Sequence, residues 1–197
     1  MEKDISLKDT TNFLINCISD TKRLKDSSKV LGSLDIPFTR FEAIKHKRSV
    51  VGCGMSHLSL LSKIKPGTLI LEDDIAGTSV AQNVMHYPEE ADAIYLGVSN
   101  HGYIRVVPIG HRHTVLATQY SPNWKRVFNM CSTHAILYLT QSYINTAKQV
   151  IESCLENDIA FDVGLASIHR HFNILTPNDP WFYQTGQEAF TNLTLEV

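Results

Sequence analysis

The first 75 residues alternate between short apolar runs and segments with helical periodicity, and this alternation constrains the fold more than any other feature. Apolar runs at residues 12–17, 37–43 and 68–71 predict strands. Residues 24–34 and 50–64 predict helices, and Pro66-Gly67 ends the second of them. Strands and helices that alternate with linkers of a few residues are typical of an α/β sheet with substantial parallel pairing.

The rest of the chain continues this pattern with more variation. We expect a short helix at 79–85, a strand at 93–97, a hairpin formed by 103–107 and 114–118, a strand at 134–139, an amphipathic helix at 141–156 and a loop-like tail after Pro177. The sequence shows neither an internal repeat nor a change of composition that would mark a linker. A chain of 197 residues is about one domain long, so we expect a single domain over 1–197.

Composition excludes several classes of protein. With 43% hydrophobic and 19% charged residues, the chain can bury a core and is neither disordered nor fibrous. Its four cysteines form no Cys-x-x-Cys pair, which argues against a disulfide framework or a zinc knuckle. Every apolar run is shorter than the roughly 20 residues of a membrane-spanning helix, and residues 1–4 lack the apolar core of a secretory signal. We therefore expect a cytoplasmic protein.

Three adjacent carboxylates, Glu72-Asp73-Asp74, directly follow the apolar strand at 68–71. Open α/β sheets bind ligands beyond the carboxyl ends of their strands, and a hard divalent cation would neutralise the repulsion among these acids. In an extended chain Glu72 and Asp74 would point the same way and could hold Mn²⁺ or Mg²⁺ against a diphosphate. The alternative is an acidic turn that closes a strand.

The segment at 50–58 supports three interpretations. Gly52-x-Gly54, with Glu72 twenty residues further on, resembles the fingerprint of a dinucleotide- or S-adenosylmethionine-binding enzyme. Gly54-Met55-Ser56 resembles a nucleophile elbow, although Leu58 stands where its closing glycine belongs. In the third interpretation these small residues lie within a helix that packs closely on the sheet, and Ser56 and His57 face the cleft.

Taken in order, these segments resemble glycosyltransferase family 25, the family of lipooligosaccharide and collagen galactosyltransferases. The resemblance covers about residues 12–184 and depends on the order of its motifs. They are Phe13-Leu14-Ile15-Asn16 with Asp20 and Arg23, Phe41-Glu42-Ala43-Ile44, Gly52-Cys53-x-x-Ser56-His57-Leu58, Leu71-Glu72-Asp73-Asp74, Ala93 to Gly97, Thr133-His134-Ala135, Phe161-Asp162, and Pro180 with Gln184.

The resemblance implies a GT-A-like fold, in which a Rossmann-type mixed sheet is flanked by helices, and a metal-dependent enzyme that transfers a sugar with inversion. The donor would be a nucleotide sugar, with UDP as the expected nucleotide. The residues expected to bind it are Asn16, Arg23, Ser56, His57 and Asp73. Glu72 and Asp74 would hold Mn²⁺ or Mg²⁺. Asp162 is the expected base that takes the proton of the acceptor hydroxyl, with Asp158 and Glu156 as alternatives.

The acceptor lies beyond what the sequence determines. A glycan, a protein hydroxyl and a hydroxylated base in DNA all remain open, because acceptor specificity resides in variable loops. Basic clusters at 45–48, 111–113, 125–126 and 169–171 fit either one nucleic-acid-binding face or separate solvated loops. A catalytically silent binding module with the same fold is a further alternative.

Overall fold

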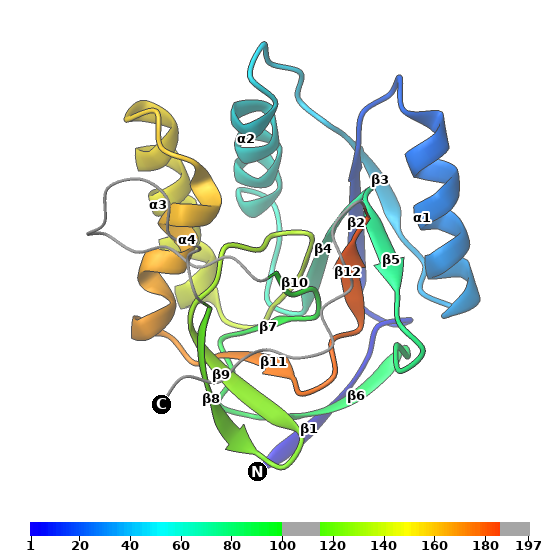
Figure 1. The fold of residues 1–197 in the computed structure, drawn as a ribbon, viewed down its shortest axis with the longest axis vertical. Helices are drawn as coiled ribbons and strands as arrows, with labels where there is room; N and C mark the ends of the chain where they lie inside the picture. Colours follow the sequence, from blue (N-terminus) through cyan, green and yellow to red (C-terminus); the bar gives the residue numbers. More distant parts are fainter. Residues whose placement is uncertain (100–114, 186–197) are drawn as a thin grey trace.

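A computed structural model describes residues 1–99 and 115–185 of the chain (Figure 1). Its first half is the predicted strand–helix alternation, preceded by a strand at the N-terminus that the sequence did not predict. The elements are β1 (Glu2–Ser6), β2 (Thr11–Asn16), α1 (Thr21–Ser33), β3 (Thr39–Glu42), α2 (Ser49–Leu61) and β4 (Thr68–Glu72). Strand β2 pairs in parallel with β3 on one side and with β4 on the other. The order β3-β2-β4 therefore places the first strand of the unit between the two that follow it.

The second half completes a mixed sheet. Its elements are β5 (Ile75–Gly77), β6 (Val84–Pro88), β7 (Ala93–Tyr95), β8 (Leu116–Ser121), β9 (Trp124–Asn129), β10 (Ala135–Tyr138), α3 (Gln141–Glu156), α4 (Phe161–Ile168), the 3-10 turn η1 (His169–His171), β11 (Ile174–Pro177) and β12 (Phe182–Gln184). The eight-stranded sheet has the order β3-β2-β4-β10-β7-β11-β9-β8. Pairs β1-β6 and β5-β12 form two small antiparallel sheets.

Two hydrophobic cores lie on opposite faces of the large sheet because neighbouring residues of each strand point to opposite sides. Ile15 and Ile70 face the core built with α2, α3 and α4, whereas Leu14 and Leu71 face the core built with α1 and the small sheets. Figure 1 shows this division, with α1 on one side of the sheet and the other three helices on the opposite side. The prediction of an α/β fold with a mixed sheet flanked by helices is confirmed.

Local sequence signals explain where the helices begin and end. The Asp20 carboxylate accepts a hydrogen bond from the Arg23 backbone N–H at the start of α1, and the Thr140 hydroxyl caps α3 in the same way. Gly67 has a φ of 86°, a conformation that favours glycine, so the predicted break at Pro66-Gly67 is a turn between α2 and β4.

Two predicted elements differ from the structure. The helix expected at 79–85 is wrong: this segment has no helix and ends in β6, which pairs with β1 and buries Met85 and Tyr87 in alternation. The tail after Pro177 contains β12, which pairs with β5. The first arm of the hairpin predicted from 103–107 and 114–118 lies outside the described residues, so that hairpin stays a prediction; β8 also pairs with β9. Within the part of the chain that is described, no helix is long and apolar enough to cross a membrane.

Candidate functional site

In the parallel part of the sheet, the strand order reverses at β2. From β2 the chain passes through α1 to β3 at one side, and from β3 it returns through α2 to β4 on the other side of β2. The two connecting helices cover opposite faces of the sheet, which leaves a crevice beyond the carboxyl ends of β2 and β4. Open α/β sheets bind their ligands at such a switch point.

A pocket of about 360 Å³ occupies this crevice. That volume lies within the range of about 300–1,000 Å³ that is common for small-molecule sites. Its lining combines the ends of β2 and β4, the first turn of α1 and the loop from β3 into α2: Ile15, Asn16, Cys17, Asp20, Arg23, Ala43, Ile44, Lys45, His46, Ser49, Gly52, Cys53, Glu72, Asp73 and Asp74. Five of the predicted site residues are therefore brought together in one cavity, namely Asn16, Arg23, Glu72, Asp73 and Asp74.

The three carboxylates do not continue the strand. Strand β4 ends at Glu72, and Asp73 and Asp74 form a turn before β5 begins at Ile75. The expectation that Glu72 and Asp74 point the same way rested on an extended chain, and that premise is wrong. The turn instead gives each of the three carboxylates its own set of partners.

Glu72 contacts α2 and the segment just before β10. Its Oε1 lies 3.0 Å from His57 Nε2 and accepts a hydrogen bond of 2.6 Å from the Thr133 hydroxyl. Burial raises the pKa of Glu72, but these two partners outweigh burial and lower it to about 2. Glu72 is therefore an ionised carboxylate with one oxygen already occupied by two partners.

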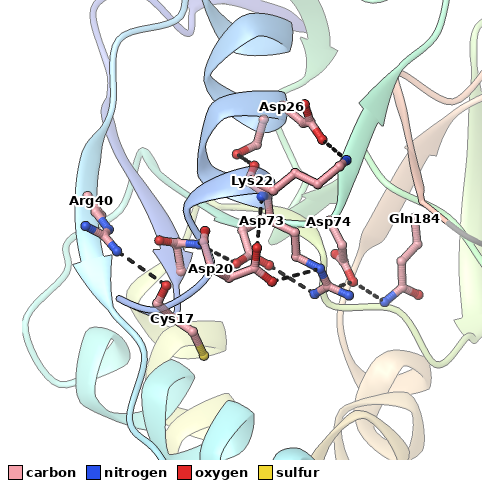
Figure 2. Close-up of polar contacts among 11 residues, drawn as sticks. Cys17, Asp20, Lys22, Asp26, Arg40, Asp73, Asp74 and Gln184 are labelled. Carbon is pink, nitrogen blue, oxygen red and sulfur yellow. Dashed lines mark hydrogen bonds and ion pairs between the residues drawn. The ribbon is translucent and has the colours of Figure 1, made fainter.

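Asp73 lies between the predicted donor-binding residues. Its Oδ2 accepts a hydrogen bond of 2.6 Å from Asn16 Nδ2, and its Oδ1 lies 3.3 Å from Arg23 Nη1. Figure 2 shows Asp73, Asp74 and Gln184 side by side, with Asp20 next to them. Asn16 and Arg23 thus fix Asp73 at the floor of the pocket.

Asp74 is the least satisfied acid of the three. It is 8% exposed; its Oδ2 accepts a hydrogen bond of 2.8 Å from Gln184 Nε2 and lies 3.8 Å from Arg23 Nη1. Its Oδ1 is buried and has no hydrogen-bond partner among the described residues. Burial, followed by the charge of Glu72, raises the pKa of Asp74 to about 6. A buried carboxylate oxygen that lacks a partner fits the ligand set of a hard divalent cation.

A second group of possible metal ligands lies beside this turn. Cys53, His57 and Glu72 each offer one ligand atom, and these atoms lie within 4.8 Å of one another. Burial and the charge of Glu72 raise the pKa of the Cys53 thiol, so the thiol stays protonated. The hydrogen bond between His57 and Glu72 accounts for their approach without a metal. Among the described residues, the buried carboxylate oxygen that lacks a partner is Oδ1 of Asp74.

The structure decides among the three interpretations of the segment at 50–58. Gly52, Gly54 and Ser56 all lie inside α2, so the interpretation as a helix is confirmed. A dinucleotide fingerprint needs its first glycine in the turn between strand and helix, whereas Gly52 is the fourth residue of α2. A nucleophile elbow needs an exposed serine, whereas Ser56 is 0% exposed. Both of those interpretations are wrong.

Ser56 and His57 do not face the cleft as expected. Both are fully buried, and neither lines the pocket. The glycines beside them let α2 pack closely, at Gly52 on the preceding loop and at Gly54 on Leu155 of α3 and Phe161 of α4. Ser56 and His57 instead contact residues that line the pocket: Ser56 bonds the Ile44 backbone, and His57 bonds Glu72.

The three candidates for the catalytic base lie away from the pocket floor. Asp162 is in the first turn of α4, half-buried, with its Oδ1 accepting a hydrogen bond from the Val163 N–H. The pKa of the pocket-lining Cys53 thiol is raised mainly by burial, then by the charges of Glu72 and Asp74. The charge of Asp162 makes a smaller contribution. Glu156 is exposed, and the exposed Asp158 forms an ion pair with Arg48. Asp162 is thus a candidate whose charge is among the causes of the raised pKa of Cys53.

Three pocket-related residues were missed by the sequence reasoning. Thr133 and Gln184 belong to matched motifs but had no assigned role, and they hydrogen-bond Glu72 and Asp74. Lys45 lines the pocket and belongs to the basic cluster at 45–48, which was considered only for nucleic acid. Of the other clusters, 111–113 lies outside the described residues, and His169 is fully buried against Tyr95.

Comparison with known proteins adds little beyond the fold. No protein-family model matches the chain, and no curated protein matches it significantly. Among solved structures, the chain is similar to the CTP:phosphocholine cytidylyltransferase of Streptococcus pneumoniae, with 6% sequence identity and a TM-score of 0.47. The match covers 88% of this chain and 92% of that one. An overlap of this quality bears on neither substrate nor mechanism.

Proposed function

We propose that this protein is a metal-dependent inverting glycosyltransferase that transfers a sugar from a nucleotide sugar, with UDP as the expected nucleotide, to a hydroxyl acceptor. The observation that carries the proposal is the buried, unpartnered Oδ1 of Asp74 in a switch-point pocket. Supporting it is the resemblance of the motif order to glycosyltransferase family 25 and its GT-A-like fold. The pocket collects the predicted residues of the opening strand and of the acidic motif at one place.

Asp74 is the residue that fits a hard cation, and Mn²⁺ or Mg²⁺ held there would stabilise the charge that develops on the leaving diphosphate. Glu72 contributes its negative charge nearby, while its Oε1 stays with His57 and Thr133. Asn16 and Arg23 hold Asp73 in a fixed position, which keeps the turn rigid. A preorganised turn saves the enzyme the cost of arranging these charges during the reaction.

Inversion requires a base on the side of the sugar opposite the leaving group. We assign this role to Asp162, which would accept the proton of the acceptor hydroxyl while the new glycosidic bond forms and the bond to the diphosphate breaks. Its position at the start of α4, on the α2–α3–α4 face, separates it in the chain and in the fold from the acidic turn. The acceptor stays open among a glycan, a protein hydroxyl and a hydroxylated DNA base.

The proposal is tested by nucleotide binding. Thermal shift and calorimetry with UDP, with and without Mn²⁺, should show binding that depends on the metal, and UDP-galactose or UDP-glucose should be hydrolysed slowly. The Asp74→Asn variant should lose the increase in UDP affinity that Mn²⁺ gives. Asp9→Asn, which changes an exposed aspartate outside the pocket lining, should keep it. Absence of any nucleotide effect would overturn the proposal.

Two other outcomes would assign a different function to this protein. Stabilisation by NAD, NADP or S-adenosylmethionine in place of UDP would indicate a cofactor-binding enzyme, although Gly52 lies in α2 and cannot supply the usual turn. Tight UDP binding with donor that stays intact after long incubation would indicate a binding module without catalysis.

A further inference from the structure

The loop between β3 and α2 forms one wall of the pocket. Its residues Ala43, Ile44, Lys45 and His46 all line the cavity, and Lys45 and His46 are exposed. The Lys45 ammonium group makes no ion pair or hydrogen bond among the described residues, whereas the other cation of the lining, Arg23, lies within 4.0 Å of three aspartates. Lys45 is therefore the cation that remains available to a ligand.

Helix α2 holds this loop in place through its buried residues. The Ser56 hydroxyl donates a hydrogen bond of 2.7 Å to the Gly52 carbonyl and accepts one of 2.8 Å from the Ile44 N–H. At Gly52 a Cβ would lie 2.5 Å from the Ile44 carbonyl oxygen, which is closer than real Cβ atoms approach, and 3.2 Å from the His46 nitrogen, which is a tight contact. Glycine at this position lets the loop backbone rest directly on the helix.

The far end of the loop is also fixed. The His46 ring nitrogen Nδ1 lies 3.1 Å from the Arg48 backbone nitrogen and 3.3 Å from the Arg48 carbonyl oxygen. The Arg48 guanidinium pairs with Asp158 in the turn between α3 and α4. The segment from Ile44 to Arg48 is thus held at both ends, with Lys45 between them.

The charge of the pocket indicates what this loop could bind. Four carboxylates line the cavity, those of Asp20, Glu72, Asp73 and Asp74, against the two cations Arg23 and Lys45. An anion would be repelled by this set unless positive charge met it from the opposite wall. Arg23 is already paired with the acids of the floor, so Lys45 is the group that can meet a phosphate.

We propose that Ile44, Lys45 and His46, held on α2 by Ser56 and Gly52, form a phosphate-binding rim in which Lys45 contacts the diphosphate of the donor. This inference deepens the proposed function and rests on it. Lys45 is the binding residue, and Ser56 is a positioning residue that acts through the Ile44 backbone. In this proposal the role of Gly52 and Ser56 is to hold the loop backbone on α2, and neither residue contacts the donor directly.

The first test compares ligands with and without phosphate. In Lys45→Met, a charged hydrogen bond to phosphate is lost, so affinity for UDP in calorimetry should fall by about tenfold. Affinity for uridine, which carries no phosphate, should not change. Lys47→Met is the matched control, since Lys47 is an exposed neighbour outside the pocket lining and its loss should leave UDP affinity within about twofold of the wild type.

The second test concerns Ser56. Ser56→Ala should weaken UDP binding and leave uridine binding unchanged, and its effect should shrink in the Lys45→Met background because both changes act on one contact. Ser62→Ala is the control, since the Ser62 hydroxyl also donates to the carbonyl four residues earlier, that of Leu58, but among the described residues makes no hydrogen bond to the loop between β3 and α2. Equal, additive losses for UDP and uridine would show that Ser56 merely supports the fold.

Inorganic pyrophosphate with Mg²⁺ separates this inference from the proposed function. If the wild type binds pyrophosphate and Lys45→Met binds it about tenfold more weakly while no nucleotide binds, the rim stands and the glycosyltransferase proposal fails. If UDP binds equally well to the wild type and to Lys45→Met, the rim is wrong and the proposed function stands. If the wild type binds neither UDP nor pyrophosphate, both are wrong.

Discussion

Replacing Asp74 by asparagine should make the metal-free protein more stable at neutral pH while it weakens the site. The Asp74 carboxylate is buried beside the ionised Glu72, and its Oδ1 has no partner among the described residues. An asparagine of nearly the same size removes the buried charge and keeps an oxygen for the Gln184 amide. Function and stability thus pull in opposite directions at this residue.

The magnitude follows from the pKa. Burial and the charge of Glu72 raise the pKa of Asp74 from 3.8 to about 6. Because the folded value exceeds the unfolded one, the folded protein binds the proton more tightly, and stability falls as pH rises from about 4 to about 6. A difference of about two pKa units corresponds to about 3 kcal/mol. The wild type should therefore be less stable than Asp74→Asn by up to about 3 kcal/mol at pH 8, and the gap should close near pH 4.

Urea unfolding of both proteins at pH 4, 6 and 8, with a chelator present, measures this difference. Addition of Mn²⁺ at pH 8 should stabilise the wild type and leave Asp74→Asn unchanged, because a ligand that binds the folded state stabilises it. A gap of the same size at pH 4 and pH 8 would refute the reasoning, as would a variant that is less stable than the wild type at pH 8 without metal.

Further predictions concern other parts of the molecule. For Glu72 the sign is opposite: its pKa is lowered from 4.5 to about 2, so Glu72→Gln should cost up to about 3 kcal/mol at pH 7, and urea melts should show this cost vanishing as pH falls from about 4.5 toward 2. Asp162→Asn should leave UDP affinity unchanged in calorimetry and reduce transfer by about two or more orders of magnitude; near-normal turnover would remove Asp162 from the role of base. Gly97→Ala should lower the free energy of unfolding by about 1–3 kcal/mol, because its methyl group would overlap the buried ring of His134. The exposed Gly32→Ala, with open space around it in α1, should instead raise it by about 0.5–1 kcal/mol.

Local signals were sufficient to predict most of the first half of the fold. Apolar runs and helical periodicity specify β2, α1, β3, α2 and β4 because each element buries a face with its own period, and that period is written in neighbouring residues. The same holds for α3, which spans residues 141–156 as predicted. The segment at 79–88 failed because β6 is a strand through its pairing with β1, more than seventy residues away along the chain.

The sequence alone determined the α/β class and singled out the acidic run after β4, because periodicity and charge are properties of adjacent residues. The tertiary structure alone decided which atoms of that run are satisfied. Because the chain turns at Asp73 and Asp74, Glu72 contacts His57 and Thr133. Asp73 contacts Asn16 and Arg23. One oxygen of Asp74 has no partner among the described residues. These partners of Glu72 and Asp73 come from β2, α1, α2 and the segment just before β10. They meet only because the order β3-β2-β4 brings the ends of β2 and β4 together.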